Sequence, residues 1–571
     1  MKRIQFYIIV LAACSLGVGT VHCGWAQNLE GISKQKPFKV SGSIGAGATY
    51  YSSNEPGLSR PPYSWSVYGS LTAQVYGISL PLSFTVNQYG KSYSQPFSQF
   101  GISPTYKWAK LHLGYRYMQF SPLTYDGQSF RGAGIELNPK LFRFAAFYGK
   151  LNKKVNEDTS SGRFVQPQFA RTGYGLKIGI GNYSSYFDLI YLHAKDDSAS
   201  AKLINKQLIT PQENSVLGTS MKLTLLKKII FSSDIAVSGL TQNFGDSIPT
   251  KDSGVLARAF KRIGRTNEST LVDWAGQSSL QLLLKGYTTT IGYRIVRPGF
   301  KSLGTPYMLN DVALLNWLNN FNLLSGKLNI TTTLSSQHNN LKKTLPTEMQ
   351  TLVGSISMNA LLSRQFNLNL NYAGYRIRQK DGTLRLTDST RLHQVIHQVN
   401  LTPSFITSNT YHSHSVSANA GYMLLDDKNP LSTRSSSSNN SSGSLSYTHG
   451  WVKKSVGLSL TGLYNQYRQD TNYYRTLGAT IGGNAALLKE KALSVQGAVG
   501  YLLNQSSYGN SRNNLTFSFN AGYHRQHHSL TLYANYVYTP FNPINNIIYK
   551  QVAQAVATKN LAGGISYTYS F

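Results

Sequence analysis

The sequence predicts an all-β chain that forms a single large antiparallel up-and-down transmembrane β-barrel of about 26 strands, within a range of roughly 22 to 28. Three observations predict it. Apolar and polar residues alternate along most of the chain, the alternating segments run for roughly 10 to 15 residues, and their connections are short and long in turn. Strands of soluble β-sandwiches average about 5 to 6 residues, whereas a tilted strand needs about 9 to 11 to cross a bilayer.

The composition excludes several other classes. The chain has 571 residues with 55 Lys+Arg against 23 Asp+Glu, a formal charge of +32. Only 14% of the residues are charged, against about 25% in soluble proteins. A mean hydropathy of −0.25 argues against a multi-helix membrane protein, and an aromatic content of 12% argues against disorder. The Lys and Arg residues are scattered, which argues against nucleic acid as a partner.

Residues 1–26 have the order of a secretory signal peptide. Lys2 and Arg3 precede the apolar segment 6–13, and small residues lead to an expected cut between Ala26 and Gln27. This leaves residues 27–37 as a short periplasmic segment and residues 38–571 as the barrel.

Both cysteines lie in the predicted signal peptide. An alternative remains open in which residues 11–14 form a lipoprotein box and Cys14 is lipidated. With cleavage after Ala26, Cys14 and Cys23 are both lost, so the mature chain is expected to have no disulfide, thiol nucleophile or zinc-thiolate site.

The alternation is clearest near the C-terminus, where residues 514–524 present one apolar and one polar face, as expected of a strand between lipid and water. Tyrosines such as Tyr115 and Tyr148 recur at segment ends, which is typical of an interfacial girdle. The apolar face of residues 514–524 carries Leu515, Phe517, Phe519, Ala521 and Tyr523, and the polar face carries Asn514, Thr516, Ser518, Asn520, Gly522 and His524.

The connections predict the orientation. Expected strands begin near residues 38–51 and end with residues 559–571. Short links alternate with longer polar ones, which is typical of tight periplasmic turns and longer external loops, and this places both chain ends on the periplasmic side. Short links are expected at residues 77, 108, 138–140, 181–182, 227–228, 286, 325–326, 364, 408–409, 489–490 and 525–526.

The end of the chain carries a recognisable pattern. Leu561, Ile565, Tyr567, Tyr569 and Phe571 share one face. This resembles the terminal strand by which bacterial outer-membrane β-barrel proteins are recognised for assembly. The resemblance is to the porin-like class and, in its Tyr- and Asn-rich composition, to proteins of the Bacteroidota, with no specific family identified. It implies the cell outer membrane as location, and the barrel-assembly machinery, outer-membrane lipid and lipopolysaccharide as partners.

A barrel of this size needs an obstruction. About 26 strands spaced 4.8 Å apart and tilted about 40° give a diameter of roughly 50 Å. Because only residues 27–37 precede the first expected strand, we expect no N-terminal plug domain. Inward loops, a flattened barrel, or a lumen-filling or periplasmic partner protein remain as alternatives.

The longest link, Leu240–Thr270, is the candidate constriction loop. Its basic residues would attract anions by focusing positive potential in a narrow passage. The alternative is a surface loop that meets the phosphates of surface glycolipid. The candidate residues are Lys251, Arg258, Lys261, Arg262 and Arg265.

Several charged residues fall on the predicted inward faces, where water solvates charge that would be costly against lipid. In one alternative, Arg116, Glu136 and Arg143 on consecutive strands simply pair with one another. The candidate lumen charges are Arg116, Glu136, Arg143, Lys177, Asp188, Lys222, Asp234 and Arg294.

Catalysis has little support. His412 and His414 share a face beside a turn, and the expected register sets His397 opposite Ala420, far from His414. We expect no enzyme activity, no catalytic residue, no metal site and no cofactor.

Two function classes remain. In the first, the chain is a channel for polar or anionic solutes. In the second, it is a non-conducting scaffold, receptor or secretion-associated barrel filled by loops or a partner protein.

Overall fold

The computed structural model describes residues 38–54, 61–76, 78–88, 99–157, 166–204, 209–246, 248, 258, 260–261, 266–507, 512–540 and 557–571. The predicted signal peptide 1–26 and the segment 27–37 lie outside these residues. Within the described part of the chain, no helix is long and apolar enough to cross a bilayer.

The described residues form 27 strands and three very short helices. The first half comprises β1 (Phe38–Ser53), β2 (Tyr63–Val75), β3 (Ile78–Asn87), β4 (Gln99–Ile102), β5 (Thr105–Tyr106), β6 (Ala109–Tyr117), β7 (Ser129–Leu137), β8 (Phe142–Asn152), β9 (Ala170–Gly181), β10 (Tyr186–Asp197), β11 (Glu213–Leu225), β12 (Ile229–Thr241), β13 (Thr270–Leu284) and β14 (Tyr287–Val296). The second half comprises β15 (Val312–Leu323), η1 (Leu324–Gly326), β16 (Leu328–His338), β17 (Thr347–Leu361), β18 (Phe366–Asp381), β19 (His393–Ser408), β20 (His412–Asp427), α4 (Thr433–Ser436), β21 (Ser438–Trp451), β22 (Val456–Gln469), β23 (Asn472–Leu487), η2 (Lys489–Lys491), β24 (Leu493–Ser506), β25 (Arg512–Arg525), β26 (His528–Thr539) and β27 (Thr558–Ser570).

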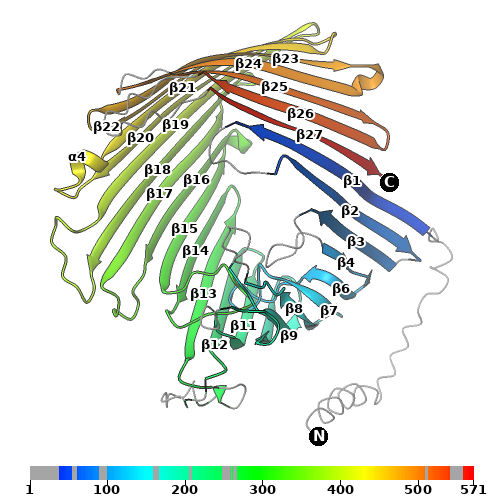
Figure 1. The fold of residues 1–571 in the computed structure, drawn as a ribbon, viewed down its shortest axis with the longest axis vertical. Helices are drawn as coiled ribbons and strands as arrows, with labels where there is room; N and C mark the ends of the chain where they lie inside the picture. Colours follow the sequence, from blue (N-terminus) through cyan, green and yellow to red (C-terminus); the bar gives the residue numbers. More distant parts are fainter. Residues whose placement is uncertain are drawn as a thin grey trace.

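The strands form one closed antiparallel barrel of 26 positions within the described residues. Each strand pairs with its sequence neighbours, and β1 pairs with β27 from Ser43↔Ser570 to Ser53↔Asn560. Figure 1 shows β1 and β27 side by side where the wall closes. β4 and β5 share one position between β3 and β6. The break between them falls at Pro104, which has no N–H to donate to a ladder. The predicted fold class and strand number are therefore confirmed.

Two loops establish which face of the wall is the interior. Residues 118–128 join β6 to β7, and residues 297–311 join β14 to β15. These loops touch, because the Oγ of Ser302 donates a 2.6 Å hydrogen bond to the carbonyl oxygen of Thr124. Loops that leave strands so far apart around a closed wall can meet only on its concave side. The face that they cover is the interior, and alternation through the paired registers assigns every other strand residue to a face.

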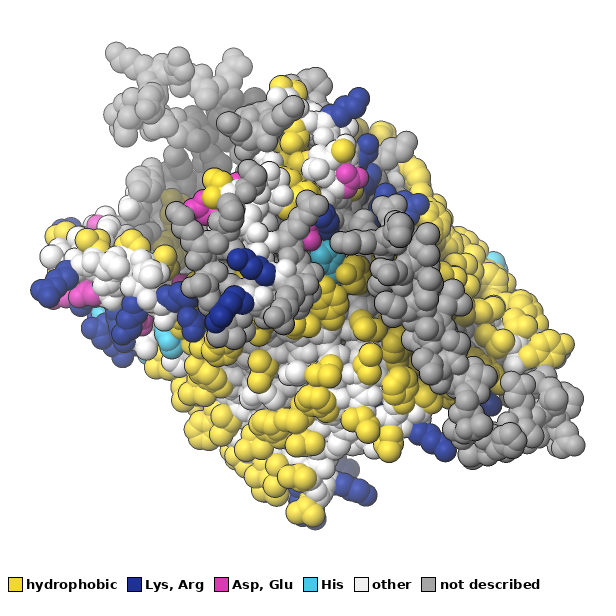
Figure 2. Space-filling view, turned by 90° about the horizontal axis from the view of Figure 1, so that it is seen from below, with side chains coloured by type: hydrophobic (Ala, Val, Ile, Leu, Met, Phe, Trp, Pro, Cys, Tyr) yellow, Lys and Arg dark blue, Asp and Glu magenta, His cyan; other side chains and the backbone are white. Residues whose placement is uncertain are grey.

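The outward face is apolar. On β17, Leu352 and Ile356 point outward and are 40% and 45% exposed, while Ser355 and Ser357 between and beyond them point inward. The same division holds around the wall, and Figure 2 shows hydrophobic side chains in a broad field on one side, with most charged groups outside that field. Exposed apolar area of this extent is typical of a barrel that faces lipid.

The connections divide the barrel into two rims. Links such as 138–141, 226–228 and 285–286 are short, and they alternate with longer links such as 198–212 and 382–392. We call the two ends the short-link rim and the long-link rim. The start of β1 and the end of β27 both lie at the short-link rim, where the backbone N–H of Phe571 donates to the carbonyl oxygen of Gly42.

Replacing Ile481 with Arg tests the assignment of faces. Ile481 lies in the middle of β23, is 58% exposed and points outward, so an Arg there is expected to lower the free energy of unfolding by about 2 to 4 kcal/mol in lipid vesicles. Urea titration in vesicles measures this. The neighbouring Thr480 points inward, so Thr480→Arg serves as the control with little expected effect. Equal losses for both variants would contradict the assignment.

Candidate functional site

The interior of the barrel is narrowed by the two loops that fold into it. We name residues 118–128 inner loop A and residues 297–311 inner loop B. Both follow unusually short strands, since β6 has 9 residues and β14 has 10. They cover the inner face of the wall between them.

An apolar cluster holds both loops against the wall. Phe120, Leu123 and Tyr125 of inner loop A and Phe300 and Leu303 of inner loop B are each at most 5% exposed. A fully buried side chain of this size stabilises the folded state by about 1.5 to 3 kcal/mol, so the loops are fixed parts of the structure. The wall and flanking residues of the cluster are Met118, Phe130, Ala145, Phe147, Leu151, Ile190, Leu192, Ala194, Val216, Ala236, Leu240, Ala275, Val296 and Val312.

Tyr125 is the polar exception in this cluster. Its ring lies 4.4 Å from that of Phe147, centroid to centroid. Its hydroxyl group is buried and has no hydrogen-bond partner among the described residues. Burial raises the pKa of the Tyr125 hydroxyl, because the phenolate would be poorly solvated there.

A buried amide on the wall holds the middle of inner loop B. Asn214 on β11 is fully buried. Its Nδ2 donates to the Oγ of Ser238 (2.8 Å) and to the carbonyl oxygens of Gly239 (3.0 Å) and Lys301 (3.2 Å), and its Oδ1 accepts from the N–H of Leu303 (2.9 Å). The bond from Leu303 satisfies a loop N–H that would otherwise be buried without a partner. The carbonyl oxygen of Lys301 accepts from both Asn214 and the Oγ of Ser238.

The two inner loops also meet at Gly304. Its carbonyl oxygen accepts a 3.0 Å hydrogen bond from the N–H of Asp126. A Cβ at Gly304 would lie 2.6 Å from the carbonyl oxygen of Thr124 and 2.6 Å from Leu192 Cδ2. The loops can therefore pack at this distance only because residue 304 has no side chain.

A buried carboxylate anchors the base of inner loop B. Asp273 on β13 is 5% exposed. Its carboxylate oxygens form salt bridges with Arg297 Nε (2.9 Å) and Lys342 Nζ (2.8 Å). It also accepts a hydrogen bond from the N–H of Gly299 (3.2 Å). Because Lys342 belongs to the link between β16 and β17, this carboxylate connects inner loop B to a second long link.

The structure places the predicted lumen charges on inward faces. The register of β6 to β14 gives all eight residues the same orientation as the residues that contact the inner loops. Their role in conduction stays a prediction. The eight are Arg116, Glu136, Arg143, Lys177, Asp188, Lys222, Asp234 and Arg294.

The alternative in which Arg116, Glu136 and Arg143 pair with one another is wrong. Arg143 forms a bidentate salt bridge with Asp188, with Nε and Nη2 2.7 and 2.9 Å from the two carboxylate oxygens. Glu136 instead accepts from His112 at 2.6 Å, and Arg116 donates to a serine hydroxyl on β3. Asp188 is 1% exposed, so removing either member of its pair would leave a buried charge without compensation.

Four of these cations give the interior an excess of positive charge. Arg116, Lys177, Lys222 and Arg294 form no salt bridge within the described residues, whereas the carboxylates of Glu136 and Asp188 are both paired. Asp234 and Arg294 line a cavity of about 220 Å³ against β13 to β15. Asp234 also has no salt-bridge partner among the described residues, so these eight inward residues carry five cations against three carboxylates, an excess of two positive charges.

The predicted constriction loop, Leu240–Thr270, is described only in part. Arg258 and Lys261 are exposed. Phe260 between them is 4% exposed and packs over Gly239, which lies on the outward face of β12. Lys251, Arg262 and Arg265 lie outside the described residues, and a role for this link in constriction stays a prediction.

His412 and His414, which the sequence places on one face of a strand, both contact a third histidine. Their rings lie 3.3 and 3.4 Å, nitrogen to nitrogen, from His449 on β21. All three point outward near the short-link rim. Over the described part of the chain, no group of three or more His, Cys, Asp or Glu side chains is arranged to hold a metal ion.

Comparisons with known proteins give similarity to solved structures alone. The chain matches no protein-family model and no curated protein. It is similar to the P pilus usher (PapC) translocation pore, with a TM-score of 0.37 and 9% identity over 93% of this chain and 99% of that one. For OpdQ of Pseudomonas aeruginosa the TM-score is 0.33 and the identity is 12%, over 60% of this chain and 93% of that one. For the FrpB iron transporter of Neisseria meningitidis the TM-score is 0.37 and the identity is 11%, over 94% of this chain and 83% of that one. Similarities at this level assign neither a substrate nor a partner.

Replacing Gly304 with Ala tests the packing of the inner loops. The added methyl group is expected to push the loops apart and to lower the free energy of unfolding by about 1 to 3 kcal/mol, as overpacking does elsewhere. Urea titration and the rate of limited proteolysis within inner loops A and B measure the effect. Gly354→Ala is the matched control, because nothing lies within 4 Å of a Cβ at that position. A Gly304→Ala protein as stable and as protease-resistant as the control would contradict the loop contact.

Proposed function

We propose that this chain is an outer-membrane, porin-like channel for polar solutes, with a preference for anions. In this proposal the long-link rim faces outward from the cell, and both ends of the barrel lie at the periplasmic rim. The observation that carries the proposal is the partial filling of the interior. The inner loops cover the wall from β7 to β14, and the rest of the inner face is polar and accessible.

The accessible part of the interior is lined by uncharged polar side chains. On β17 to β26, many inward residues are exposed within the closed wall. Hydroxyl and amide groups exchange hydrogen bonds with water and with passing solutes at little cost. Examples are Ser357, Asn371, Asn484, Gln496 and Thr531.

The charge of the interior supports the preference for anions. Arg116, Lys177, Lys222 and Arg294 lack carboxylate partners and face the passage from the side that the loops narrow. A narrow passage with low-dielectric walls focuses the potential of such charges. The link Leu240–Thr270 would add positive potential near the long-link rim, since Arg258 and Lys261 are exposed.

The last strand supports the proposed location. Ile565, Tyr567 and Phe571 are 41% to 46% exposed, and Leu561 and Tyr569 share their outward orientation. This side chain pattern is available to assembly machinery before β27 pairs with β1.

Conductance of the refolded protein in a planar bilayer tests the proposal. We expect discrete openings that favour anions over cations. Replacing Lys177, Lys222 and Arg294 with Gln is expected to reduce the ratio of anion to cation permeability severalfold, because the unpaired positive charges of the interior are removed. Reversal potentials in a salt gradient measure this ratio.

The matched control removes the same number of charges outside the passage. Lys227, Lys228 and Lys285 are exposed in short turns, so their replacement with Gln is expected to leave selectivity nearly unchanged. A folded but silent barrel would contradict the channel and would favour a scaffold, receptor or secretion-associated barrel whose lumen a partner protein fills.

Replacing Asn214 with Ala tests whether inner loop B narrows the passage. The buried N–H of Leu303 would lose its partner, which costs about 1 to 3 kcal/mol, and the carbonyl oxygen of Lys301 would keep only its bond from Ser238. We expect the loop to leave the wall more often, and single-channel conductance to rise with larger fluctuations. Asn316→Ala, at an exposed inward amide of β15, is the control with unchanged conductance. Identical traces for the two variants would mean that inner loop B does not limit the flow.

A further inference from the structure

A row of basic and aromatic side chains crosses the outside of the barrel near the long-link rim. Tyr115 pairs with Arg131, Arg131 with Lys150, and Lys150 with Thr172 on the strands β6 to β9. All four lie on the outward face, so Arg131 and Lys150 are neighbours that point away from the lumen. The guanidinium of Arg131 lies 5.6 Å from the centroid of the Tyr115 ring.

The position of this row along the strands places it at the level of lipid headgroups. β6 and β7 have only 9 residues each, close to the minimum of about 9 to 11 that a strand needs to cross a bilayer. Arg131 is the third residue of β7, and the outward residues beyond it, such as Ile135, are apolar. A Lys or Arg facing lipid is costly at the bilayer midplane and tolerated near the interface. Because the strands are so short, Arg131 and Lys150 near their ends lie at the depth of the lipid headgroups.

These two cations are not neutralised by the protein. Arg131 and Lys150 form no salt bridge within the described residues. The next cation of the row, Lys195, differs because its Nζ lies 2.8 Å from the carboxylate of Glu213. The positive charges of Arg131 on β7 and Lys150 on β8 therefore remain available to a ligand.

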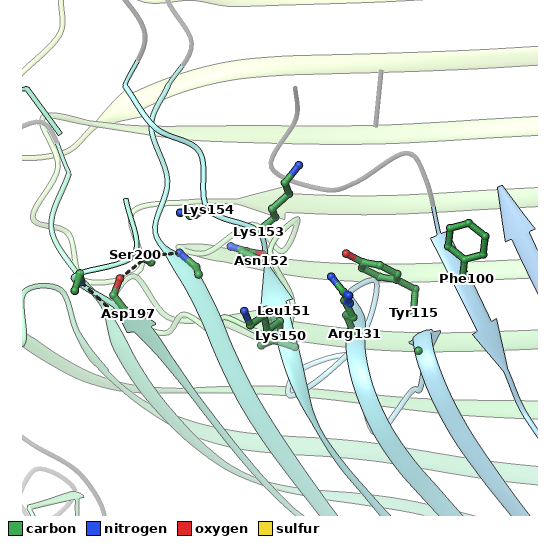
Figure 3. Close-up of a pocket in the computed structure, with 13 residues that line it drawn as sticks. Phe100, Tyr115, Arg131, Lys150, Leu151, Asn152, Lys153, Lys154, Asp197 and Ser200 are labelled. Atoms are coloured by element: carbon green, nitrogen blue, oxygen red, sulfur yellow. Dashed lines mark hydrogen bonds between the residues drawn. The ribbon is translucent and has the colours of Figure 1, made fainter. Parts of the chain in front are cut away.

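The cations line a concave site. A cavity of about 870 Å³ opens beside the row, and Figure 3 shows Arg131 next to Tyr115, with Lys153 and Lys154 near Asn152. Among the described lining residues the one carboxylate is that of Asp197, which accepts from the N–H of Ala199 at 3.2 Å. The described residues that line the cavity are Phe100, Gly114, Tyr115, Arg131, Lys150, Leu151, Asn152, Lys153, Lys154, Ala170, Asp197, Ala199 and Ser200.

We propose that this outer cavity binds the phosphate groups of a glycolipid in the outer leaflet of the membrane. Arg131 offers a fork of N–H donors that suits a phosphate, and Lys150 offers a point charge beside it. Phe100 is 56% exposed and, with Tyr115, provides an apolar border toward the acyl chains. The site is separate from the passage, and its assignment to the outer leaflet rests on the orientation given under the proposed function.

Lipid titration of the full-length, delipidated protein tests the site. The probe is lipid A with two phosphates in detergent micelles, and native mass spectrometry measures the bound fraction. Each Lys or Arg near a lipid surface changes affinity about fivefold, so replacing Arg131 and Lys150 with Gln is expected to weaken binding about 30-fold. Removing the phosphates from the probe should weaken binding to the unmodified protein similarly, with no further loss for the double variant.

Three results would overturn the site. These are unchanged affinity in the Arg131→Gln, Lys150→Gln variant, an equal loss when Lys227 and Lys228 of the short-link rim are replaced with Gln, and inorganic pyrophosphate binding as tightly as the lipid. A heat-modifiability gel checks that each variant folds. Because the double variant leaves the lumen untouched, its conductance should match that of the unmodified protein. A silent protein that still binds the lipid through Arg131 and Lys150 would contradict the channel alone.

Discussion

Pairing of every backbone N–H and C=O within the wall is the constraint on which the rest of this structure depends. Hydrocarbon offers no hydrogen-bonding partner, so a membrane-spanning sheet must close on itself. The ladder from Ser43↔Ser570 to Ser53↔Asn560 joins the two ends of the chain and removes both edges. Closure in turn requires an even number of positions if both ends are to reach the same rim. The interrupted position that β4 and β5 share keeps that number at 26 within the described residues.

Closure at this size creates a second requirement, because a wide lumen has to be narrowed from within. The polypeptide does so with inner loops A and B, which bring apolar side chains into a passage that is otherwise polar. Such loops are stable there only if their own backbone groups find partners. Asn214 and Asp273 provide them, since their buried amide and carboxylate bind loop backbone and loop cations together.

Alternation alone predicted the strands, the two faces and the inward orientation of residues such as Lys222, because a strand exposes its side chains with a fixed period. It could not predict which link folds inward. Length and charge drew attention to Leu240–Thr270, whose role in constriction stays a prediction. The signal for inner loop A was the set of large apolar residues in residues 118–128, which is unusual for an external link. Register was also hard to predict. His397 pairs with Leu424 rather than with the expected Ala420, because the turn after β19 is longer than the two residues assumed.

The uneven height of the wall connects the interior with the exterior. Strands β17 to β25 have 14 to 16 residues, whereas β6 and β7 have 9. At the short strands β6 and β7 the apolar outward face ends almost where the strands end. Arg131, which points outward there, therefore lies at the depth of the lipid headgroups. Inner loop A, which joins β6 to β7, also folds into the lumen from this part of the wall. Short strands thus bring the narrowing of the passage and the outer basic cavity to the same part of the barrel, on opposite faces of one wall.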